Sequence, residues 1–238
     1  MKKKCDEHNY GQIVKASIEL KKISNALHQI DVDVNRTSIA SGNVEIAKIN
    51  EEKILPRILK IVELEGQKEM SYEQGFADVA GMIILKFFGH DNAKSYSDLK
   101  LKEEEAKIFY VYKKIIKVLS TLHLKLGEQR LFHDYENAFI YDNPLIIGFL
   151  VCSIKTGFTR YLKQPYLMKF WDSVIINSNN CCKTMDKIIF AFLKNCFQKL
   201  KEIIGDELDN FGHSEIISQF FEEMNDDTFN RLLNKALN

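Results

Sequence analysis

The chain has 238 residues, enough for one large domain or two small lobes, and its hydrophobic fraction of 45% excludes a disordered chain. Its 33 basic and 33 acidic side chains cancel, so the bulk charge does not support nucleic-acid binding, which normally needs a basic excess. The basic start at Met1 is followed by no apolar run and is not a secretory signal. The five cysteines lack the spacing of zinc sites or disulfide frameworks, which favours a reducing, cytoplasmic setting.

The scarcity of proline and glycine favours long helices. An apolar stripe at steps of three and four runs from Ile13 to Ile30, and Asp33 and Arg36 continue the same steps. We expect further helices at about 52–66, 71–89, 103–127, 129–141, 144–162, 166–177, 184–203, 213–223 and 227–237. No stretch shows sustained strand-type alternation, so the sequence predicts an all-α fold. The polar residues after Gly127 are the expected boundary between two helical lobes.

Two short motifs carry candidate functional residues. Ile30, Asp33 and Arg36 form the pattern I-x-x-D-x-x-R, and Tyr72, Gln74 and Gly75 form Y-x-Q-G. Each motif also has a simpler interpretation. Asp33 and Arg36 could be an i,i+3 ion pair on a helix surface. Ser71 and Gln74 could form a capping box, in which the glutamine bonds back to the Ser71 N–H. Glycine in a first helical turn lowers helix propensity, which suggests that Gly75 has another reason to be there.

These motifs, in this order, resemble the TBC-domain family of Rab GTPase-activating proteins. Two later segments are similar to patterns of that family: Ala106-x-x-Phe109 after an acidic start, and Arg160-Tyr161-Leu162 through Pro165 to Phe170-Trp171-Asp172. The resemblance covers roughly residues 28–200. It implies an all-α domain of two lobes over 28–238, with the motif-bearing lobe reaching about 127 and the second lobe about 128–238. Residues 1–27 would be an N-terminal helical segment, reduced relative to the family.

The resemblance also implies a chemistry. Arg36 would be an arginine finger that neutralises charge on the transferring phosphate, and Gln74 a glutamine finger that orients the attacking water. Ile30 would anchor its segment in the core, and Asp33 would hold the Arg36 guanidinium. Tyr72 would brace the glutamine loop, and Gly75 would let the backbone approach a partner closely.

The implied partner is a Rab-family small GTPase in its GTP–Mg²⁺ form, and the chain would need no cofactor of its own. It would activate the partner in trans rather than act as a complete enzyme. We expect a cytoplasmic protein in vesicle traffic, peripheral on endomembranes through its partner, without nucleic acid. The family's N-terminal R-x-x-x-W-like pattern is missing, and Ser153 stands where the family usually has a tryptophan. An inactive TBC-like scaffold that holds a GTPase is therefore one alternative.

A second alternative is a metal phosphohydrolase of the HD type. It is suggested by the dipeptide His133-Asp134, and it would need an earlier histidine and a later aspartate as further metal ligands. Residues of the required types are present in the chain: His90 or His123, and Asp172 or Asp186.

Overall fold

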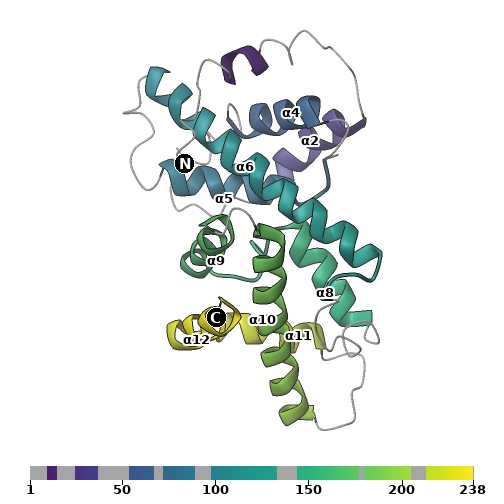
Figure 1. Ribbon diagram of the computed structural model, residues 1–238. Helices are drawn as coiled ribbons and strands as arrows, with labels where there is room; N and C mark the ends of the chain where they lie inside the picture. The colour runs from purple at the N-terminus through teal and green to yellow at the C-terminus, as the bar shows by residue number, and fades with distance from the viewer. Residues whose placement is uncertain are drawn as a thin grey trace. The chain divides into compact units, whose positions relative to one another are not determined.

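The computed structural model describes residues 10–14, 25–36, 54–66, 72–88, 98–132, 144–176, 180–204 and 213–237 (Figure 1). Within these ranges every regular element is helical, which confirms the all-α prediction. The chain divides into two compact units, Met1–Lys117 and Val118–Asn238. The division falls inside helix α6 (Asp98–Gly127), ahead of the polar residues where the sequence suggested a boundary.

The first unit contains α2 (Asn25–Arg36), α4 (Leu55–Gly66), α5 (Phe76–Phe88) and the first part of α6. Helices α2, α4 and α5 pack on one another (Figure 1). α5 is apolar on nearly all sides and therefore belongs in a core. Its buried side chains include Phe76, Val79, Ala80, Ile83 and Ile84.

One buried carboxylate joins three segments of the first unit. Glu105 in α6 is 3% exposed. Its Oε1 accepts hydrogen bonds from the Tyr10 hydroxyl and the Arg57 Nε, both at 2.7 Å, and its Oε2 accepts from Arg57 Nη2 at 2.6 Å. The acidic run 103–105 was expected in the first turn of its helix, but α6 already begins at Asp98. The charge of Glu105 is therefore balanced by Arg57, as a buried carboxylate requires, and not by the helix dipole.

The second unit contains α8 (Pro144–Lys155), α9 (Gln164–Ile176), α10 (Cys181–Ile204), α11 (His213–Glu222) and α12 (Asp226–Leu237). α10 packs against α9, α11 and α12, and α11 also contacts α8 (Figure 1). The ring of Phe192 in α10 lies 6.4, 6.2 and 5.7 Å, between centroids, from those of Phe170, Phe221 and Phe229. This aromatic cluster joins α9, α10, α11 and α12 into one core.

Helix α8 ends at Lys155, whereas the sequence predicted a helix to residue 162. The N–H of Phe158 donates to the Ser153 carbonyl oxygen at 2.8 Å, and the N–H of Gly157 donates to the Ile154 carbonyl oxygen at 3.1 Å. This pair of bonds is the Schellman motif, which needs a left-handed residue after the helix. Gly157 supplies it with a φ of 58°.

The same arrangement ends α6 without using a glycine. The N–H of Arg130 bonds to the Lys125 carbonyl oxygen at 2.8 Å, and that of Gln129 to the Leu126 oxygen at 3.1 Å. Gln129 takes the left-handed conformation with a φ of 55°. The helix predicted near 129–141 therefore does not begin there: residues 128–132 form turns, and 133–143 lie outside the described residues.

Candidate functional site

The first motif occupies the last two turns of α2, the helix that packs on α4 and α5. Ile30 is fully buried, Asp33 is 5% exposed, and Arg36 is the last residue of the helix. Asp33 therefore lies on the core side of α2 and not on a solvated helix surface. The side chain of Arg36 lies outside the described residues.

The second motif forms a tight turn immediately before α5. The Phe76 N–H bonds to the Glu73 carbonyl oxygen at 3.1 Å, which closes a four-residue turn with Gln74 and Gly75 at its centre. Gly75 has a φ of 103°, as the third residue of a type II turn requires. Glycine adopts this conformation without the strain of a side chain. A glycine is therefore found at position 75 because this turn needs a positive φ there, and not because of any function within a helix.

This turn also overturns two predictions. Because α5 begins at Phe76, the helix predicted from Ser71 starts five residues too early. Gln74 then precedes the helix and cannot be the third helical residue of a capping box that starts at Ser71. Its side chain is exposed on the turn. Gly75 itself is buried, so its observed role is to shape the turn that presents Gln74.

One hydrogen bond joins the two motifs. The Tyr72 hydroxyl donates to Asp33 Oδ2 at 2.9 Å, and Gln29 Nε2 donates to Asp33 Oδ1 at 2.9 Å. The bond from Tyr72 connects residues 39 positions apart in the chain. Arg36 lies one helical turn after Asp33, about 5 Å along the axis, and Gln74 lies two residues after Tyr72. The backbone positions that carry the arginine and the glutamine are therefore brought to the same region of the first unit.

A second carboxylate, which the sequence analysis missed, holds the other side of this tyrosine. Glu63 in α4 is 6% exposed, and its Oε2 accepts the backbone N–H of Tyr72 at 2.7 Å. Glu63 belongs to no motif. The available signal is its place in the row Leu55, Leu59, Glu63, where two fully or nearly fully buried leucines precede it at helical spacing. A glutamate on the core side of a helix indicates a specific polar partner.

Together, Asp33 and Glu63 fix Tyr72 through its hydroxyl and its backbone. The ring of Tyr72 also packs edge-on against Phe76 on the far side of the turn, with 6.1 Å between centroids. The turn that carries Gln74 is thus held at both ends while the glutamine itself is exposed. Such a preorganised loop can present a carboxamide to another molecule with little loss of conformational freedom on binding.

The environment of Tyr72 favours its neutral form. Burial raises its pKa well above the usual value of a tyrosine, and the Asp33 charge and its hydrogen bond raise it further. Above about pH 10, an unfolded chain would lose this proton while the folded chain keeps it. The contribution of the Tyr72 hydroxyl to stability is therefore complete below about pH 10 and declines as the pH rises further.

We expect Tyr72→Phe to lower the free energy of unfolding by about 1–3 kcal/mol at pH 8, because it leaves a buried carboxylate short of one hydrogen bond. The difference from the wild type should shrink at pH 11. Urea denaturation of both proteins at the two pH values measures it. A variant as stable as the wild type at pH 8 would show that the bond to Asp33 does not stabilise the fold.

The third segment that resembles the family lies in the second unit. Phe170 and Trp171 are buried and Asp172 is exposed. The indole Nε1 of Trp171 donates to the Gly157 carbonyl oxygen at 3.0 Å, so Trp171 is a core residue that braces the turn after α8. Ser153 is fully buried, and its Oγ has no hydrogen-bond partner in the described part of the chain.

No family model, no curated protein and no solved structure matches this chain. The relation to the TBC family is therefore a proposal, and it depends on the motif residues and on their geometry.

The HD-type alternative depends mainly on residues whose structure is not described. His133 and Asp134 lie outside the described residues, as does His90. Among the side chains that are described, no group of three or more histidines, cysteines, aspartates or glutamates is placed to hold a metal ion. None of the described helices combines the length and apolar character that a membrane crossing needs.

Proposed function

We propose that this chain is a GTPase-activating protein for a Rab-family small GTPase. In this proposal Arg36 and Gln74 enter the partner's active site, and the nucleotide and Mg²⁺ belong to the partner. GTP hydrolysis needs charge neutralisation on the transferring phosphoryl group and a water held in line with it. A guanidinium provides the first, and a carboxamide, which both donates and accepts hydrogen bonds, provides the second.

The observation that carries the proposal is the 2.9 Å hydrogen bond from the Tyr72 hydroxyl to Asp33. It links I-x-x-D-x-x-R to Y-x-Q-G through Asp33, three residues before Arg36, and Tyr72, two residues before Gln74. Three further features support the proposal. Gln74 is exposed on a tight turn, Gly75 has the backbone conformation that this turn requires, and Glu63 holds the Tyr72 backbone from α4.

A screen of single-turnover GTP hydrolysis across a panel of Rab GTPases tests the proposal. At least one GTPase should be accelerated by about 10³–10⁵ when the chain is present. Binding of each GTP-loaded Rab is measured in parallel. A Rab that binds without acceleration would identify the chain as a scaffold. If no Rab in the panel is bound or accelerated, the proposal is wrong.

A further inference from the structure

A hollow of about 270 Å³ lies between α10 and α12 in the second unit. The apolar part of its lining, here called the floor, includes Phe190 of α10 together with Leu232 and Ala236 of α12. Ala236 and Ala191 have small side chains, so the space between the helices is not filled there. The hollow is smaller than most sites for drug-sized ligands, and its volume suits one or two apolar side chains.

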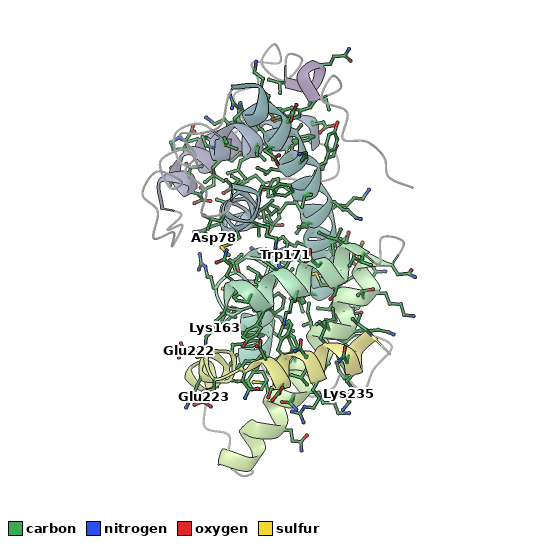
Figure 2. The ribbon with its side chains drawn as sticks, turned by 90° about the vertical axis from the view of Figure 1, so that its left-hand side faces the viewer. Asp78, Lys163, Trp171, Glu222, Glu223 and Lys235 are labelled. Carbon is green, nitrogen blue, oxygen red and sulfur yellow. The ribbon has the colours of Figure 1, made fainter. Side chains whose placement is uncertain are left out.

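The charged side chains that line the hollow, here called its rim, are all cationic. Lys187 and Lys194 line it from α10, and Lys235, labelled in Figure 2, lines it from the last turn of α12. No aspartate or glutamate is among the lining residues. None of these lysines forms an ion pair with a described residue. Lys187 and Lys194 are seven residues apart, about 10 Å along the helix, so the positive charge is spread along the groove.

We propose that this hollow, the α10–α12 groove, binds a short acidic segment of a partner protein that carries leucine-like side chains between its carboxylates. The apolar floor would accept the side chains, and Lys187, Lys194 and Lys235 would face the carboxylates. Asn195, which also lines the groove, can bond to the peptide backbone. Acidic residues spaced along an extended segment, at about 3.3 Å per residue, can reach successive lysines. The inference does not depend on the proposed GTPase activation.

Other anionic partners fit less well. A bilayer presents a broad surface that cannot enter a hollow between two helices, and three lysines fall short of the four to eight typical of a membrane-binding cluster. A free phosphate would leave the apolar floor exposed to water. A nucleic acid binds chiefly through a basic surface that follows its backbone, and it would make no use of a leucine-sized recess.

The test uses a fluorescein-labelled eight-residue peptide with three glutamates on each side of a pair of leucines. Fluorescence anisotropy at about 50 mM salt, where charge interactions are weakly screened, should show saturable binding to the full chain. Lys194→Glu and Lys235→Glu should each weaken binding about tenfold, since each replaces an attraction by a repulsion. The matched control is Lys169→Glu, which reverses an exposed lysine of α9 and should change binding less than twofold.

A second peptide with serines in place of the leucines keeps the charge and removes the apolar side chains. Binding at least fivefold weaker would support insertion into the floor. Four outcomes would overturn the proposal. These are no saturation, an equal loss with Lys169→Glu, displacement by inorganic phosphate at equal concentration, and binding of phosphatidylserine vesicles in preference to the peptide. Circular dichroism of each variant confirms that it is folded.

Discussion

Replacing Arg36 by alanine should lower stimulated GTP hydrolysis by about 10³ while partner binding changes little. In the proposed mechanism the guanidinium would interact chiefly with charge that develops in the transition state and would contribute little to the ground-state complex. Single-turnover hydrolysis with saturating activator isolates the chemical step, and titration with the GTP-loaded partner gives the affinity. Arg36→Lys should recover only a small part of the rate, because lysine keeps the charge but not the planar fork.

The matched control for this experiment is Arg231→Ala, which removes an exposed arginine from α12 in the second unit. This control should keep the wild-type stimulation. An Arg36→Ala protein that stimulates as well as the wild type would remove Arg36 from the mechanism. A loss of binding that matches the loss of rate would assign Arg36 to partner recognition instead.

Replacing Gln74 by alanine should reduce the stimulated rate by about 10²–10³, the usual cost of removing one positioned hydrogen-bonding group from a transition state. Stability should stay within about 0.5 kcal/mol of the wild type, because Gln74 is exposed and precedes the helix. The turn depends on Tyr72 and Gly75, which are unchanged. The rate measured beside a thermal melt therefore separates a catalytic role from a structural one.

Gln164→Ala, at the exposed start of α9, is the control for loss of a surface glutamine. Gln74→Asn tests reach, since it keeps the carboxamide but shortens the side chain by one methylene group, and it should recover little of the rate. If Gln74→Ala kept the full rate, the partner's own glutamine would be the residue that orients the water. Gln74 would then only contact the partner and take no part in orienting the water.

Periodicity was sufficient to predict most of the helices. The apolar spacing in α4, α6 and α12 repeats over several turns, so their presence follows from the need to bury one face. Helix ends were harder to predict because they depend on backbone conformation. Ser71 has the character of a helix cap and predicts a start there, but the turn at Gly75 delays α5 to Phe76. The sequence gives no comparable signal that Gln129 is left-handed, because glutamine rarely adopts that backbone conformation.

Long-range polar partners could not be read from the sequence. Asp33 and Arg36 share a helix, and this proximity suggested that the aspartate serves the arginine. The structure adds a bond from Gln29, one turn earlier in α2, and a bond from Tyr72, 39 residues away, and only the second depends on how α2, α4 and α5 pack. Glu63 and Glu105 resemble many surface glutamates until their partners are known. Once buried, each of these carboxylates needs specific partners, because a carboxylate removed from water must receive hydrogen bonds from donors placed at its oxygens.

The most direct test of the central claim is a crystal structure of this chain bound to a responsive Rab GTPase with GDP and aluminium fluoride, which mimic the transferring phosphoryl group. The quantity to measure is the distance from the fluoride and the attacking water to the Arg36 guanidinium and the Gln74 carboxamide. Our account predicts that both groups lie at hydrogen-bond distance, about 3 Å. A complex in which either group stays roughly 10 Å or more from the nucleotide would contradict it, because neither effect acts over that distance.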